Sequence, residues 1–201
     1  MIPYFALIII PLFLRILLIA SHKQILVGKH GQIINSDNIV LPTFFLLFFL
    51  LLALRHPSIG RDLPNYRYLF FYLGWSSLND VLAESSEILY HLYCWVVYNY
   101  ISTDFQIFLA ITAALSVAPI AYVYNQEKSH GYLKIVVFVN MTTFIMLFSG
   151  IRQGLAMSLG LLAYQAMKDK HTWRYVFWSF IAAFIHNTGF MVFLFYPLYR
   201  M

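Results

Sequence analysis

The chain has 201 residues, of which 61% are hydrophobic and only 10% are charged, and its formal net charge is +5. Soluble domains carry roughly 25% charged residues, so this composition excludes an ordinary globular domain and indicates an integral membrane protein. The apolar runs have the length of helices and lack the alternation of barrel strands. We therefore predict an all-α fold, a polytopic transmembrane bundle of about six or seven segments that forms a single domain over residues 1–201. Basic residues in such a bundle report topology and lipid contact, so nucleic acid is not an expected partner.

The candidate membrane segments follow one another along almost the whole chain. They are Ile2–Ala20, Ile39–Leu54, Ile88–Ile101, Phe105–Tyr124, Tyr132–Phe148, Ile151–Met167 and Tyr175–Tyr196. The first segment lacks the charged start and the cleavage site of a signal peptide, so we interpret it as a transmembrane helix. The stretch from Ile135 to Met167 would be about 50 Å long as one helix, which is too long for one span and short for two. It predicts either two short helices that meet at Ser149 and Gly150 or a re-entrant half.

The main polar insertion, residues 55–87, separates the second and third candidate segments. Pro64 is placed to begin a helix in it. Aromatic residues fit a helix that lies in the membrane interface, and they are Tyr66, Tyr68, Phe70, Phe71, Tyr72 and Trp75. The carboxylates of Glu84 and Glu87 then precede the third segment, where a helix N-terminus favours negative charge. We predict a polar, interfacial loop for this region.

The orientation of the chain in the membrane is left open by its charges. Most basic residues follow the second, fourth and sixth segments, namely Arg55, Arg61, Arg67, Lys128, Lys134, Lys168, Lys170 and Arg174. The positive-inside rule would place these loops in the cytoplasm. In the opposite orientation, Lys23 and Lys29 would hold the first loop inside. If all seven segments cross, the Arg61–Asp62 loop and the turn before Arg152 lie on opposite faces.

Arg152 and Gln153 form the first candidate site, because they interrupt a long apolar stretch. A guanidinium keeps its charge in lipid, at a cost of at least ~2.5 kcal/mol near the bilayer centre. Arg152 is therefore expected to face inward toward an anionic partner such as a phosphate, with Gln153 adding a neutral donor and acceptor. The alternative is an arginine at a helix end whose side chain extends to the interface.

His186 is the second candidate, since it lies within the last candidate segment, about 12 Å along a helix from Trp178. An imidazole exchanges protons near neutral pH and can also donate a hydrogen bond to a phosphate oxygen. The alternative is a packed histidine bonded to a neighbouring helix. Arg61, Asp62 and Tyr66 suggest a polar group of residues over one end of the bundle that includes a general base. The alternative is a solvated loop with weak exposed ion pairs. Glu87 is either functional or simply the start of a helix.

Several familiar sites are missing from the sequence. We find no phosphate-binding glycine loop, dinucleotide fingerprint, zinc-protease helix or nucleophile elbow. The spacing of Asp, Glu and His residues does not suggest a metal centre, and the lone Cys94 forms no intrachain disulfide. We therefore expect neither a metal nor another cofactor, and no nucleotide hydrolysis by this chain.

Taken together, the motifs resemble the EpsG family, the Wzy-like membrane polymerases of bacterial exopolysaccharide, capsule and O-antigen. The residues that carry the resemblance are Leu54-Arg55, Gly60-Arg61-Asp62 with Tyr66, Glu87, the block from Phe148 to Ala156, and the block from Ala182 to Asn187. Arg61 departs from the family, which commonly has a small hydroxyl residue before the aspartate. Family members are usually longer and have further spans, so we expect this chain to be an N-terminal portion, whose activity alone is in doubt.

The resemblance implies transfer of an undecaprenyl-diphosphate-linked glycan onto a lipid-linked repeat unit by a multi-pass protein of the bacterial cytoplasmic (inner) membrane. It implies substrate binding by Arg55, Arg61, Tyr66, Arg152 and Gln153, with the arginines neutralising the diphosphate as it leaves. A base for the acceptor hydroxyl would come from Asp62, Glu87 or His186. The resemblance favours a periplasmic Arg61–Asp62 loop, against the basic-residue count. Two other functions stay open, a transporter (flippase) for the same lipid-linked glycan and a non-catalytic membrane subunit working with other polysaccharide assembly proteins.

Overall fold

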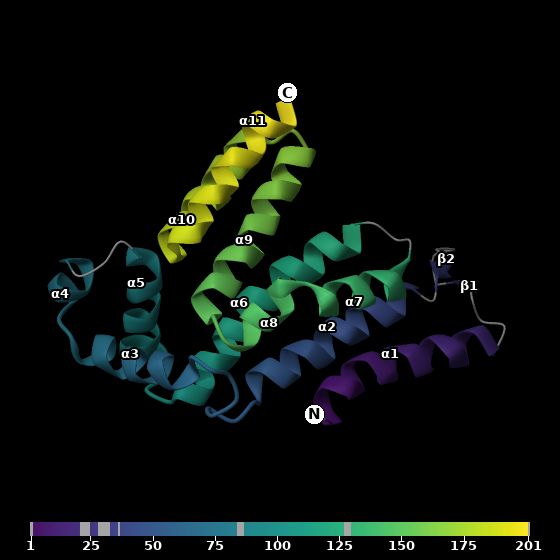
Figure 1. Ribbon diagram of the computed structural model, residues 1–201, viewed down its shortest axis with the longest axis horizontal. Coiled ribbons are helices and arrows are strands. Elements are labelled where there is room, and N and C mark those ends of the chain that lie inside the picture. Colours follow the sequence, from purple (N-terminus) through teal and green to yellow (C-terminus); the bar gives the residue numbers. More distant parts are fainter. Residues whose placement is uncertain are drawn as a thin grey trace.

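The computed structural model describes residues 2–20, 25–27, 33–35, 37–83, 87–126 and 130–200. Helices dominate this part of the chain, in agreement with the predicted all-α class (Figure 1). Their bounds are α1 (Ile2–Ala20), α2 (Asp37–Ala53), α3 (Leu63–Trp75), α4 (Leu78–Ala83), α5 (Ile88–Val96), the π-helical η1 (Val97–Ile101), α6 (Phe105–Gln126), α7 (Gly131–Asn140), α8 (Thr142–Phe148), α9 (Ile151–Lys168), α10 (Thr172–Ile185), the 3₁₀-helical η2 (Asn187–Leu194) and α11 (Phe195–Arg200). Two short strands, β1 (Ile25–Val27) and β2 (Ile33–Asn35), pair antiparallel. Four residues used above, Lys23, Lys29, Glu84 and Lys128, lie outside the described residues.

A phenylalanine cluster joins α2 to α7 and α8. Phe44 and Phe48 are fully buried on α2, where they lie one turn apart. The Phe48 ring stacks on that of Phe144, with centroids 5.2 Å apart, and meets Phe138 edge to face at 5.5 Å. Aromatic pairs of this kind add about 0.5–1.5 kcal/mol each to the burial of their surface. This cluster fixes α8, and with it the turn that leads into α9.

Among the described residues, α6 alone is long and apolar enough to cross a membrane by itself. The helices α7 and α8 pass the same test only together, as a pair bent by 65°. Shorter apolar helical stretches cover Ala6–Leu17 and Ile39–Ala53. The prediction of about six or seven spanning segments is therefore not confirmed. The predicted break at Ser149 and Gly150 is present, since α8 ends at Phe148 and α9 begins at Ile151.

The segment between α2 and α6 leaves one end of the bundle and returns to the same end. The Gln106 side chain, at the start of α6, donates a hydrogen bond to the Ala53 carbonyl at the end of α2 and another to the Arg55 carbonyl at 3.3 Å. Within the excursion, Asn99 of η1 donates to the Gly74 carbonyl of α3. Residues 88–101 pack against α3 through α5 and η1, and α5 has only 9 residues, so the prediction of a separate crossing by Ile88–Ile101 is not confirmed.

The loop after α2 is docked on the turn between α8 and α9. The Arg61 amide donates to Ser149 Oγ at 3.3 Å. Gly60 has φ of +126°, and a Cβ there would lie 2.3 Å from the Phe148 carbonyl oxygen, so only glycine fits this close approach. The Arg61–Asp62 loop and the turn before Arg152 therefore lie against each other at the same end of the bundle.

Candidate functional site

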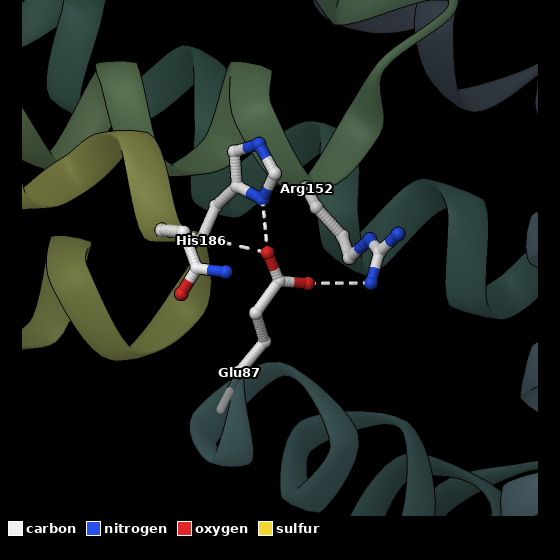
Figure 2. Close-up of polar contacts among 4 residues, drawn as sticks. Glu87, Arg152 and His186 are labelled. Atoms are coloured by element: carbon white, nitrogen blue, oxygen red, sulfur yellow. Dashed lines mark hydrogen bonds and ion pairs between the residues drawn. The ribbon is translucent and has the colours of Figure 1, made fainter. Parts of the chain in front are cut away.

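The side chains of Arg152 and His186 come from distant parts of the sequence and meet at the carboxylate of Glu87 (Figure 2). Arg152 donates from Nη1 to Glu87 Oε2 at 2.5 Å. The Nδ1 atom of His186 hydrogen-bonds to Glu87 Oε1, which also accepts the backbone N–H of Asn187 at 3.3 Å. We call Glu87, Arg152 and His186 the Glu87 cluster. It unites three of the residues that the sequence singled out, and both carboxylate oxygens are engaged.

Helix termini place the three side chains of the cluster. Glu87 immediately precedes α5, Arg152 lies in the first turn of α9, and His186 immediately follows α10. Helices α9 and α10 pack against each other along much of their length, which holds Arg152 and His186 in a fixed relation. The sequence separations, 65 residues from Glu87 to Arg152 and 99 to His186, show that only the tertiary fold creates this site.

His186 lies at a break in the predicted Tyr175–Tyr196 segment. Its backbone is extended, with φ of −156° and ψ of 140°, and it separates α10 from η2. Gly189 permits the sharp turn, because a Cβ at this position would lie 2.3 Å from the carbonyl oxygen of Ala182. The segment is therefore not one continuous helix. The break directs the imidazole toward Glu87 and frees the next backbone N–H to donate to the same carboxylate.

Two tyrosines flank the Arg152 guanidinium. Its central carbon lies 5.4 Å from the ring centre of Tyr66 and 5.6 Å from that of Tyr90. The two rings are themselves in edge contact, with centroids 6.1 Å apart, and Tyr90 is fully buried. Cation–π contacts of this kind are worth about 0.5–2 kcal/mol and restrict the guanidinium orientation. Tyr66 was among the predicted site residues, whereas Tyr90 was missed. Its position three residues after Glu87, on the same face of α5, was the available signal.

The exposure of the cluster is uneven. The side chain of Glu87 is 9% exposed, against 29% for Arg152 and 24% for His186. A ligand approaching from outside therefore meets the arginine and the histidine before the carboxylate. Figure 2 also shows the second ring nitrogen of His186 on the side of the ring away from Glu87. Within the described ranges, no group of three His, Cys, Asp or Glu side chains is arranged to hold a metal ion.

Arg55 is placed as the cap of a helix. Its guanidinium is buried and donates from Nη1 to the carbonyls of Leu147 at 3.2 Å and Phe148 at 2.7 Å. These are the last carbonyls of α8, where the helix dipole favours a cation. The cap fixes the turn that leads to Arg152, so Arg55 contributes to the site through the backbone of that turn.

The other predicted residues lie around the cluster in different surroundings. Arg61 is exposed and Asp62 is partly buried at the start of α3, where the Asp62 side chain makes no capping hydrogen bond. The Asp62 carbonyl accepts the N–H of Tyr66 at 3.1 Å and so helps to begin the helix that carries this tyrosine. Gln153 is partly buried and lines an apolar groove together with Met157 and Thr188.

A family model for the EpsG family matches residues 38–201. The chain belongs to the EpsG family. The resemblance inferred from the sequence motifs is thus confirmed, and all predicted site residues lie within the matched range. Neither the characterised proteins nor the solved structures gave a significant match.

The EpsG motif residues fall into two groups in this structure. One group holds the backbone together: Arg55 and Gly60 contact the Phe148 carbonyl, and Ser149 accepts the amide of Arg61. The other group, Glu87, Arg152 and His186, forms the cluster with polar side chains partly open to the outside. The first group therefore fixes the turn that carries Arg152.

Proposed function

We propose that this EpsG-family chain is a multi-pass protein of the bacterial cytoplasmic membrane that polymerises surface polysaccharide. It would transfer an undecaprenyl-diphosphate-linked glycan onto a lipid-linked repeat unit. The observation that carries the proposal is the convergence of Glu87, Arg152 and His186, which supplies a cation and a proton acceptor at one place. Family membership supports a role in polysaccharide polymerisation.

The surface supports a membrane location. Large apolar side chains are exposed on several helices, including Phe13 at 60%, Leu46 at 59%, Leu115 at 44% and Ile145 at 60%. Contiguous exposed apolar surface is unfavourable in water and favourable against lipid tails. With α6 as a full-length span and the bent α7–α8 pair returning toward the α2–α6 junction, the cluster would lie at the end of the bundle that carries the Arg61–Asp62 loop.

The reaction breaks the bond between the anomeric carbon and a diphosphate oxygen and makes a bond from that carbon to the acceptor hydroxyl oxygen. Negative charge develops on the departing lipid diphosphate. Arg152 would stabilise this charge, and one well-placed donor of this kind lowers a barrier by about 3–4 kcal/mol. Its restriction by Tyr66 and Tyr90 means that little orientational freedom would be lost when the diphosphate binds.

The proton of the acceptor hydroxyl would move to the ring nitrogen of His186 that lies away from Glu87. Glu87 holds the other ring nitrogen, which orients the imidazole and stabilises the imidazolium that forms. Of the three predicted bases, His186 is thus assigned the proton transfer and Glu87 a positioning role. The partial exposure of the histidine, compared with the buried carboxylate, supports this assignment.

Deletion of the gene in its own host tests the proposal against a transporter. A lost polymerase leaves single repeat units on the cell surface, whereas a lost transporter leaves none. We expect single units on a gel of surface glycan. A reconstitution with purified protein and the lipid-linked repeat unit tests the non-catalytic alternative, and failure to form any polymer there would contradict the proposal.

A further inference from the structure

The apolar groove lined by Gln153, Met157 and Thr188 lies between α9, the α7–α8 bend and η2. Its volume is about 520 Å³, within the range of about 300–1,000 Å³ that is usual for ligand sites. Its walls are mostly apolar and include Phe138, Met157, Leu161, Met191 and Val192. Methionine side chains adapt readily to irregular apolar partners. The cavity is therefore suited to a flexible hydrocarbon chain.

The groove runs along α9 away from the cluster. Gln153, Met157, Leu161 and Tyr164 line it at helical spacing, a distance of about 16 Å along the axis. Gln153 directly follows Arg152 in the first turn of α9. On the opposite wall, Thr188 is the second residue after His186. Two polar residues of the lining, Gln153 and Thr188, are thus sequence neighbours of the cluster residues, and most of the remaining lining is apolar.

Resting on the proposed function, we propose that this groove binds the polyprenyl tail of the lipid diphosphate, with the diphosphate at Arg152. Charge and polarity support this: the Arg152 guanidinium would bind the anionic head, and the mostly apolar groove, which Gln153 lines one residue further along α9, would take the long apolar tail. A soluble sugar or free phosphate would make few favourable contacts with these apolar walls. Gln153 and Thr188 would then lie at the junction between head and tail, where a neutral donor can reach a phosphate oxygen.

The test uses the purified full chain in phosphatidylcholine nanodiscs and a polyprenyl diphosphate that carries a diazirine in its tail. After irradiation, we expect labelled peptides from α9 and η2 that contain Leu161 or Met191. Unlabelled polyprenyl diphosphate should compete, whereas the same excess of phosphatidylglycerol should not. Label confined to other helices, or equal competition by phosphatidylglycerol, would overturn the proposal, the latter because any anionic lipid would then fit.

Groove-filling variants sharpen the test. Leu161→Trp and Met191→Trp should each lower labelling about tenfold or more, because an indole occupies the space of the tail. Met191 is 63% exposed, so its replacement tests the groove even if Leu161→Trp fails to fold. Val137→Trp, at a 50% exposed position of α7 that does not line the groove, is the matched control and should keep full labelling. Full labelling of folded Met191→Trp would refute the assignment.

The two proposals fail separately. Labelling measures lipid binding without polymer synthesis, so groove labelling in a protein that makes no polymer would support the groove and contradict the polymerase. Normal polymer synthesis by both groove-filling variants would contradict the groove and leave the polymerase standing.

Discussion

Replacing Glu87 by glutamine removes the charge that joins Arg152 to His186 while nearly preserving shape. Loss of one partner from a fully buried ion pair costs about 3–5 kcal/mol, because the other charge stays buried. The Arg152 side chain is 29% exposed, so water offsets part of this cost and we expect about 2 kcal/mol of lost unfolding free energy. The effect on synthesis should be larger, roughly 10²–10⁴-fold, because His186 loses the group that orients it.

A double-mutant cycle isolates the contribution of this pair. Unfolding free energies are measured in one detergent for the parent, Glu87→Gln, Arg152→Gln and the double variant. Each single variant leaves the other residue of the pair without its partner, whereas the double variant removes both charges. The double variant should therefore lose about 1–3 kcal/mol less unfolding free energy than the two single variants lose together. Additive effects within about 0.5 kcal/mol would show that the two residues do not interact and would refute the reasoning.

Three further changes test the parts that surround the pair. Arg152→Lys keeps the charge but loses the planar fork, so polymer synthesis should fall sharply in correctly inserted protein, and normal synthesis would reduce Arg152 to a point charge. Gly60→Ala should destabilise by about 2 kcal/mol or more, measured by thermal unfolding, because its φ of +126° and a carbonyl of α8 leave no room for a methyl group. In a Cys94→Ala background, a cysteine at Ser58 should react with an impermeant maleimide in intact cells, and a cysteine at His130 should not. The reason is that Ser58 and His130 lie at opposite ends of the membrane-spanning helix α6. The reverse labelling pattern would show that the chain has the opposite orientation.

The sequence predicted the members of the cluster better than it predicted their arrangement. Arg152, Glu87 and His186 each stand out because an ionisable group in apolar surroundings is costly. Their contact depends on where residues 55–104 return, and that is decided by tertiary hydrogen bonds such as those of Gln106. An apolar run such as residues 88–101 looks the same whether it crosses lipid or packs against a neighbouring helix. The sequence alone therefore could not show that the Arg61–Asp62 loop and the turn before Arg152 lie at the same end of the bundle.

The helix break after His186 was not predicted, although the sequence contains a turn signal at that place. Asn187-Thr188-Gly189 is a sequence typical of a turn and marked the break after His186, but the surrounding apolar residues favoured a continuous span. The capping role of Arg55 could not be read from the sequence, because its acceptors, the carbonyls of residues 147 and 148, lie more than 90 positions away. Orientation and the proposed substrate stay predictions.

The most direct test of the account is the length of the glycan made by a His186→Gln protein. A side-chain amide can replace one hydrogen bond to Glu87, which keeps the fold, but it cannot accept the proton of the acceptor hydroxyl at neutral pH. Surface glycan is separated on a gel and normalised to the amount of membrane-inserted protein. The account predicts single repeat units from the variant. A ladder of normal length and abundance would contradict it and leave His186 a structural residue.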